Sequence, residues 1–119
     1  MAYKAPVESY KGKIVEVTIG KGKRAVTIGG ENVLAFNQTF DEGAFPNPPK
    51  IALEVWDMEP QNWAPWILEP YKDVAADPAA WAKRCEELGA DFVFLYLISA
   101  DPNEKDTPPE QAAELVKRV

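Results

Sequence analysis

The sequence predicts an α/β fold that begins with a β-hairpin and continues as two strand–helix units of a parallel sheet. β-Branched residues alternate on both sides of a glycine-rich turn near residue 20, which is typical of a hairpin. Two short apolar runs, at residues 51–57 and 92–98, are each followed by a segment that favours a helix. Strands that alternate with helices in this order predict a parallel sheet.

The hairpin is predicted from residues 13–19 and 25–28. Val15, Val17 and Ile19 share one face of the first strand, and the loop 20–23 supplies the turn. Because this loop is both basic and glycine-rich, a phosphate-binding loop is the alternative interpretation. That alternative is disfavoured, since the loop lacks Walker spacing and no helix pattern follows it.

Residues 31–50 are expected to form an ordered crossing segment that is neither helix nor central strand. Consecutive prolines at Pro48 and Pro49 are incompatible with both. Phe36, Phe40 and Phe45 are expected to cap a core from outside. The chain is therefore expected to divide into a hairpin with its Pro- and Phe-rich crossing segment at 1–50, and two βα units at 51–119.

The first strand, 51–57, is expected to be buried because it is mostly apolar and bounded by prolines. After a proline-rich stretch with room for only a turn or two of helix, Asp77 and Pro78 predict a helix start, with Asp as N-cap. Trp81, Cys85 and Leu88 are spaced as the apolar stripe of this helix, and a glycine at position 89 suits its C-terminal cap.

The second strand is predicted at 92–98, and a second helix follows a polar loop. Thr107 and Glu110 have the spacing of a capping box, with proline at the first helical position. The apolar face of this helix is expected to consist of Ala112, Ala113, Leu115, Val116 and Val119. Two parallel strands can neither close a barrel nor cover both faces of a sheet, so we expect these units to be the N-terminal part of a larger α/β fold or to need a partner.

Composition excludes several functional classes. The chain has 119 residues, the size of one domain. Its net charge of −6 argues against nucleic-acid binding, which needs excess Lys and Arg. The apolar runs are too short to span a membrane, and the first residues do not resemble a secretory signal. A single cysteine favours a reducing compartment, so a cytoplasmic location is expected.

The absence of histidine is the most restrictive feature of the composition. No Ser-His-Asp triad, Cys-His dyad or His-bearing zinc site can be built from this chain, and its lone cysteine cannot hold an iron–sulfur cluster. General acid–base chemistry would depend on carboxylates, Lys or Tyr. We therefore expect no complete catalytic set and no metal site in this chain by itself.

Seven ordered blocks of the chain resemble one known family. The blocks lie at residues 29–36, 45–57, 70–74, 77–85, 89–91, 100–103 and 106–110. Together they are similar to the N-terminal third of the small (delta) subunit of the corrinoid/iron–sulfur protein, part of the carbon monoxide dehydrogenase/acetyl-CoA synthase system. The resemblance covers nearly the whole chain past about residue 29, and residues 1–28 match the family's hairpin only loosely.

The resemblance implies a (β/α)₈ TIM-type barrel, of which this chain supplies a leading hairpin and the first two βα units. It also implies a large corrinoid/iron–sulfur subunit as partner, which carries the 4Fe–4S cluster and shares a cobamide at the subunit interface. The cobalt takes a methyl group from a methyl-pterin, delivered by a pterin methyltransferase, and passes it to acetyl-CoA synthase. In this family no protein histidine binds the cobalt, which agrees with the composition.

Candidate cofactor-binding residues follow from the barrel geometry, in which ligands meet the carboxyl ends of the strands. Asp57 ends the first strand, and Ser99 and Asp101 follow the second. These residues could line the face that meets the corrinoid or the partner. The alternative is structural: Asp57 caps the next short helix and Asp101 starts a turn.

Further residues are open to two interpretations each. Glu54, inside an apolar strand, is expected to have a buried ion-pair or hydrogen-bond partner, or to act as a buried acid. Cys85 is expected in the core rather than as a reactive thiol. An aromatic group near the first strand could cover the core or face a macrocycle or subunit; it consists of Trp56, Met58, Trp63, Trp66 and Tyr71.

The favoured function is a subunit fragment in corrinoid-dependent methyl transfer that acts as scaffold and cofactor cover. One alternative is a fragment of a pterin-binding methyltransferase barrel, in which Glu54 would be the acid of the first strand. The other is a stand-alone interaction module that oligomerises through its unfinished sheet, since exposed strand edges tend to pair.

Overall fold

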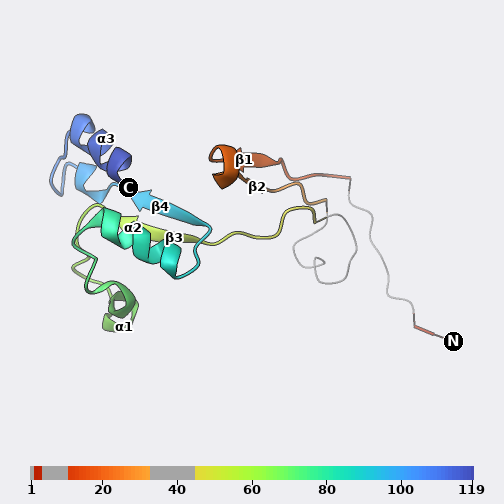
Figure 1. Cartoon of the computed structure of the whole chain (residues 1–119), viewed down its shortest axis with the longest axis horizontal. Helices are drawn as coiled ribbons and strands as arrows, with labels where there is room; N and C mark the ends of the chain where they lie inside the picture. The colour runs from red at the N-terminus through yellow and green to blue at the C-terminus, as the bar shows by residue number, and fades with distance from the viewer. Residues whose placement is uncertain (1, 4–10, 33–44) are drawn as a thin grey trace. The chain divides into compact units, whose positions relative to one another are not determined.

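The computed structural model describes residues 2–3, 11–32 and 45–119. The chain divides into two compact units, Met1–Pro49 and Lys50–Val119, and each is described by itself. Both units appear in Figure 1. The predicted core caps Phe36 and Phe40 lie outside the described residues, and so does the second half of the first block of the family resemblance, residues 33–36.

The first unit contains the predicted hairpin. Strands β1 (Val17–Ile19) and β2 (Val26–Ile28) pair antiparallel, and the turn between them includes a short 3₁₀ helix, η1 (Gly22–Arg24). The strands are shorter than predicted, but two further backbone hydrogen bonds continue the pairing. The Ile14 N–H donates to the Glu31 carbonyl, and the Gly30 N–H donates to the Ile14 carbonyl. The hairpin prediction is therefore confirmed.

The second unit is a small mixed α/β structure. Strands β3 (Ala52–Trp56) and β4 (Phe92–Tyr96) pair in parallel, with Ala52 opposite Phe92 and Trp56 opposite Tyr96. Helix α2 (Pro78–Glu87) connects them and packs against both strands (Figure 1). The predicted order of strand, helix, strand and helix is confirmed, and β4 ends two residues earlier than expected.

The remaining helices are short. Helix α1 (Pro65–Leu68) runs into the 3₁₀ helix η3 (Glu69–Tyr71), and η4 (Ile98–Ala100) follows β4. Helix α3 (Pro109–Arg118) completes the unit. Among the described residues, no helix is long and apolar enough to cross a membrane.

Helix α2 begins as its sequence predicts. The Asp77 carboxylate accepts a hydrogen bond from the backbone N–H of Ala79 at 3.2 Å, and Pro78 occupies the first turn. Gly89 adopts φ +89°, which suits a helix C-terminus. The stripe prediction is wrong at Leu88, which is 53% exposed because it lies at the C-cap, beyond the turns that face the sheet.

The capping box predicted for the last helix is also wrong. The N-cap is Pro108, with no side-chain cap, and the helix begins at Pro109. Thr107 instead donates its backbone N–H to the Ser99 carbonyl at 2.9 Å and so belongs to the preceding loop. On the predicted apolar face of α3, Val116 and Val119 are exposed and Leu115 is half-buried.

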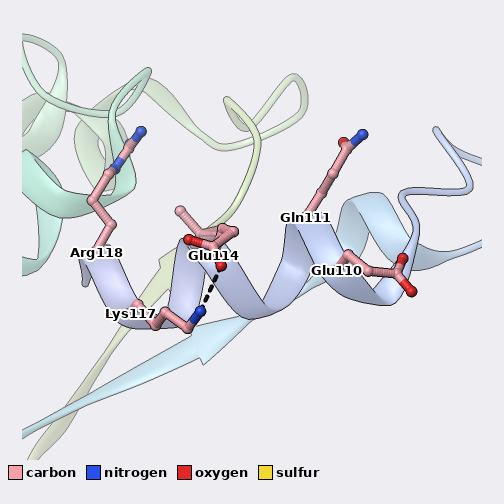
Figure 2. A pocket seen from close by; sticks show the side chains of 6 residues that line it. Glu110, Gln111, Glu114, Lys117 and Arg118 are labelled. Atoms are coloured by element: carbon pink, nitrogen blue, oxygen red, sulfur yellow. Dashed lines mark hydrogen bonds and ion pairs between the residues drawn. The ribbon is translucent and has the colours of Figure 1, made fainter.

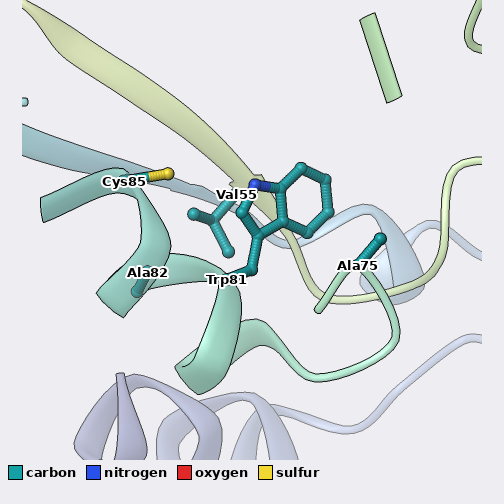
Figure 3. Packing of buried hydrophobic residues seen from close by; sticks show 5 residues of the cluster. All are labelled: Val55, Ala75, Trp81, Ala82 and Cys85. Carbon is teal, nitrogen blue, oxygen red and sulfur yellow. The ribbon is translucent and has the colours of Figure 1, made fainter. Parts of the chain in front are cut away.

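A small hydrophobic core lies between α2 and the sheet (Figure 3). Trp81 and Cys85 from α2 and Val55 from β3 are completely buried. Ala75 and Ala82 belong to the same cluster, and the close-up shows Ala75 beside the indole of Trp81. This core covers one face of the two-stranded sheet.

The other face of the sheet, here called the open face, is largely exposed. Phe94 is 53% and Tyr96 49% exposed, and Glu54, which lies opposite Phe94 in the register, is exposed as well. The prediction that 51–57 is a buried strand is therefore correct for only one of its faces. Strand alternation places five residues on the open face: Ala52, Glu54, Phe92, Phe94 and Tyr96. Trp56 lies on the same side of β3, but it packs against Trp63 and the core.

Candidate functional site

The carboxyl ends of β3 and β4 place two predicted site residues in contact. The Asp57 carboxylate accepts a hydrogen bond from the Ser99 backbone N–H at 3.0 Å and another from the Ser99 hydroxyl at 2.5 Å. The Asp57 N–H donates to the Tyr96 carbonyl at 3.1 Å. Ser99 is only 6% exposed. Asp57, at the end of β3, therefore fixes the turn that follows the neighbouring strand β4.

Asp101 has a different environment from this pair. Its Oδ1 atom accepts hydrogen bonds from the backbone N–H of Asn103 at 2.8 Å and from the Asn103 side-chain amide at 3.0 Å. Its carbonyl accepts from Glu104 and Asp106. Asp101 therefore starts a turn, as the structural alternative predicts, whereas Asp57 caps the turn at Ser99 rather than α1, whose N-cap is Ala64.

A shallow hollow of about 480 Å³ lies beside the end of β4. Its apolar wall comes from β4 and the residues just after it, and Asp101 is the acidic residue among the described ones that line it. Two aromatic residues of the open face, Phe94 and Tyr96, contribute to this wall. The arrangement can hold an apolar group against the wall, next to an acidic residue.

Glu54 is exposed, so the expectation that it is buried is wrong, whereas the expected hydrogen-bond partner is present. The residue points away from the core because the register puts it on the open face, opposite Phe94. Its carboxylate accepts a hydrogen bond from the Trp56 indole N–H. No ion pair of Glu54 occurs among the residues the structure describes.

The aromatic group splits between core and surface. Trp63 stacks edge-on against both Trp56 and Trp81, with ring centroids 5.1 and 5.5 Å apart, and Tyr71 lies 5.4 Å from Trp81. Trp66, by contrast, is 78% exposed. Most of the group therefore covers the core.

Cys85 is a core residue, as predicted. Burial raises the pKa of its thiol above the usual value. A thiol with a raised pKa is largely protonated at neutral pH and is a poor nucleophile.

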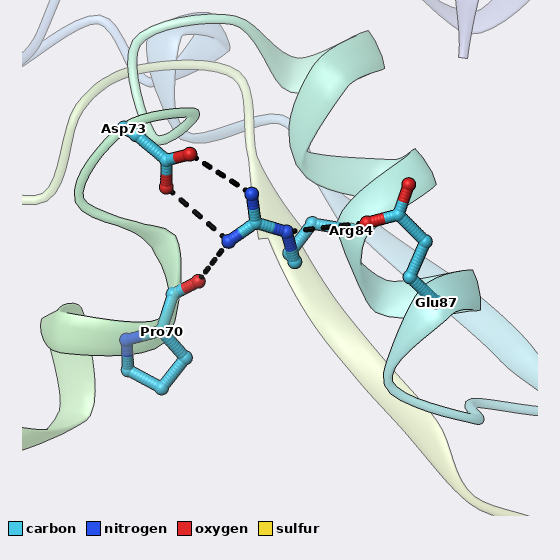
Figure 4. A network of polar contacts seen from close by, with 4 residues as sticks. All are labelled: Pro70, Asp73, Arg84 and Glu87. Carbon is cyan, nitrogen blue, oxygen red and sulfur yellow. Dashed lines mark hydrogen bonds and ion pairs between the residues drawn. The ribbon is translucent and has the colours of Figure 1, made fainter.

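Two ion-pair sites were not predicted from the sequence. Arg84 donates to both carboxylate oxygens of Asp73, at 3.2 and 2.9 Å, to the Pro70 carbonyl at 2.8 Å and to Glu87 at 3.3 Å (Figure 4). The hydrogen bonds from Arg84 lower the pKa of Asp73, and the same contacts raise the pKa of Arg84. This network ties the segment before α2 to the helix.

The second site lies at the amino end of the sheet. Asp91 accepts a hydrogen bond from the Ile51 backbone N–H at 3.0 Å and pairs with Lys50 at 3.1 Å, and these two contacts lower its pKa. Asp91 therefore joins the amino ends of β3 and β4, as Asp57 joins the carboxyl ends. The sequence signal for both is an aspartate directly next to a predicted strand.

A second hollow, of about 590 Å³, lies along α3 (Figure 2). Its lining is mainly charged, and Glu114 pairs with Lys117 at 2.5 Å across one turn. Such spacing is usual on a solvated helix face. In the described part of the chain, no group of three or more Cys, Asp or Glu residues is arranged to hold a metal ion.

Comparison with known proteins gives one consistent result. Residues 16–119 match the family described as CO dehydrogenase/acetyl-CoA synthase delta subunit. The acetyl-CoA decarbonylase/synthase complex subunit delta of Archaeoglobus fulgidus is 42% identical over 94% of this chain and 26% of its own length. The subunit of the same name from Methanocaldococcus jannaschii is 38% identical over 97% of this chain and 29% of its own length.

A third relative, from Methanothermobacter thermautotrophicus, carries the same name and is 34% identical over 98% of this chain. The chain spans less than a third of the length of these three relatives. The strand–helix order and both edge aspartates, Asp57 and Asp91, lie within the matched region. The chain belongs to the family of delta subunits of the CO dehydrogenase/acetyl-CoA synthase complex, known also as acetyl-CoA decarbonylase/synthase.

Proposed function

We propose that Lys50–Val119 form the first two βα units of a (β/α)₈ barrel, and that Met1–Pro49 provide the hairpin that precedes it. The observation that carries this proposal is the parallel β3–β4 pair, which has one covered and one open face. Parallel sheets are normally buried on both faces, and further strands would enclose the aromatic side chains of the open face.

In this proposal the completed subunit pairs with a large corrinoid/iron–sulfur subunit, which carries the 4Fe–4S cluster, and covers the cobamide at their interface. The cobamide supplies the methyl-carrying chemistry between the pterin methyltransferase and acetyl-CoA synthase. A cytoplasmic location, expected from the lone buried thiol, belongs to the same proposal.

The carboxyl edge of the sheet fits such a role as a cover. Tyr96, Leu97 and Ile98, at and just after the end of β4, form an apolar edge next to Asp101 that suits a large apolar ring with hydrogen-bond donors on its rim. Phe94 lies in the middle of β4, on the part of the open face that further strands would enclose. This chain contains no histidine that could bind the metal. Its residues would therefore hold and shield the group, while the metal's ligands come from elsewhere.

A reconstitution experiment tests the proposal. The 119-residue chain would be co-expressed with residues that follow the matched region in the Archaeoglobus fulgidus delta subunit, and with a cobamide-loaded large subunit. We expect a single complex by size-exclusion chromatography with light scattering, with the corrinoid visible spectrum under its peak.

Paired variants sharpen this experiment. Phe94→Glu places a charge on the open face and should prevent assembly, whereas Trp66→Glu changes an aromatic residue that is already 78% exposed and should not. Self-association of the chain alone, without corrinoid or large subunit, would refute the proposal and favour an oligomerising interaction module. Equal assembly of both variants would refute the enclosure of the open face.

A further inference from the structure

The loop after β4, residues 99–107, is joined end to end by a backbone hydrogen bond and is hydrogen-bonded to Asp57 at the end of the neighbouring strand. Its first residue, Ser99, accepts a backbone hydrogen bond from its last, Thr107, at 2.9 Å. Within the loop, the Asp101 carbonyl accepts from two backbone N–H groups and Asp106 adopts φ +48°. These contacts specify one loop conformation, because each fixes a backbone group that an open loop would leave to solvent.

Asp57 is the only side chain outside this loop that makes a hydrogen bond to Ser99 among the described residues, and both of its carboxylate oxygens do so. Both Asp57 oxygens therefore already accept hydrogen bonds from Ser99. Asp101, two residues beyond Ser99, uses only Oδ1 in hydrogen bonds to described residues. Asp101 is one of the residues that line the hollow, together with Phe94 and Tyr96.

We propose that Asp57 is a positioning residue: acting through Ser99, it holds the 99–107 loop so that Asp101 presents a carboxylate oxygen at the hollow to a hydrogen-bond donor of the cobamide-bearing partner. This inference rests on the proposed function for the identity of the partner. It separates the candidate site residues into two that set the geometry, Asp57 and Ser99, and one that makes the contact, Asp101.

Hydrogen exchange of the whole chain tests the positioning step without any partner. Asp57→Ala removes both acceptors, so exchange at the Ser99 and Thr107 amides should rise by about tenfold to a hundredfold, the range expected for losing hydrogen bonds to a charged group. Asp57→Asn should leave exchange close to wild type, because its Oδ1 still accepts from the Ser99 N–H and its amide can donate to the Ser99 hydroxyl.

Asp91→Ala is the matched control, since Asp91 makes the equivalent bond at the other end of the same strands. It should alter exchange near Ile51 and leave residues 99–107 unchanged. Unchanged exchange at Ser99 and Thr107 in Asp57→Ala, or an equal rise there in Asp91→Ala, would overturn the positioning role. Should Asp57→Ala unfold the unit, Ser99→Ala, which removes only the hydroxyl that donates to Asp57, supplies the second readout: unchanged exchange at Thr107 in that variant would overturn the role too.

Binding to the large subunit, with and without its cobamide, tests which residue makes the contact. Asp101→Asn should weaken binding at least about tenfold with loop exchange unchanged, the loss expected when a charged acceptor becomes neutral, and Asp57→Asn should bind like wild type. Binding lost in Asp57→Asn but kept in Asp101→Asn would overturn the assignment and make Asp57 the contact. Wild-type chain that binds neither form of the large subunit would refute the proposed function, while the exchange results still decide the positioning role.

Discussion

Trp81 is the residue on which the core of the second unit most depends. Its side chain is completely buried and lies in contact range of two aromatic rings, those of Trp63 and Tyr71. A buried indole removes roughly 150–250 Å² from water. At about 25 cal/mol per Å², less what alanine retains, Trp81→Ala should lower the free energy of unfolding by about 3–5 kcal/mol.

The buried indole N–H allows a sharper comparison. Among the described residues it has no hydrogen-bond partner. Trp81→Phe shrinks the ring but also removes this unpaired donor, whose burial costs about 1–3 kcal/mol. The two effects oppose each other, so Trp81→Phe should change the free energy of unfolding by no more than about 1 kcal/mol.

Urea unfolding of the 119-residue chain, followed by far-ultraviolet circular dichroism, measures both variants. Trp66→Ala is the control, because Trp66 is 78% exposed and its loss should cost within about 0.5 kcal/mol. Should Trp81→Ala unfold the unit outright, Trp81→Phe still reports on the core. The reasoning fails if Trp81→Phe costs as much as Trp81→Ala, or if Trp81→Ala matches the control.

Three further predictions concern single interactions. Arg84 lowers the pKa of Asp73, so Asp73→Asn should reduce the urea midpoint at pH 7. The difference in midpoint between wild type and Asp73→Asn should vanish as pH falls through the lowered pKa, because the wild-type carboxylate is then protonated. A difference that stayed constant with pH would contradict the ion pair. Cys85, buried and with a raised pKa, should react with iodoacetamide only after unfolding, so rapid labelling of native chain would contradict its place in the core. At Gly29, with φ +83°, a Cβ atom would lie 2.1 Å from a backbone carbonyl oxygen, so Gly29→Ala should abolish the hairpin's nuclear magnetic resonance signature. Gly22→Ala, the control, adds only the backbone strain of φ +56°, because its Cβ atom meets nothing within 4 Å, and it should keep that signature.

Local features of the fold could be predicted from the sequence because a few neighbouring residues determine them. Asp77 followed by Pro78 specifies the start of α2 through one side-chain bond and a fixed φ, and both are present in the structure. The start of α3 was misjudged for a reason of the same kind. Thr107 has the chemistry of an N-cap, but its backbone is bonded to Ser99, a longer-range contact that no local pattern records.

The candidate site was predictable in place but not in detail. That Asp57 and Ser99 lie at one edge follows from the parallel pairing of their strands. That Asp57 and Ser99, 42 positions apart in the sequence, form hydrogen bonds with each other depends on the register of the two strands. The Arg84–Asp73 pair escaped prediction because the turn before α2, rather than any periodicity, brings these residues together.

One physical cause accounts for the two largest departures from expectation at the sheet. Glu54 and the aromatic residues Phe94 and Tyr96 share the open face, so the same lack of covering layer leaves the carboxylate hydrated and the rings exposed. A carboxylate beside exposed rings costs little in water but would cost several kcal/mol, about what a lone buried charge requires, once further strands enclosed it. Completion of the proposed barrel would therefore have to bring a cation or several hydrogen-bond donors to Glu54, and a Glu54→Gln variant that assembled more readily than wild type would show that it brings neither.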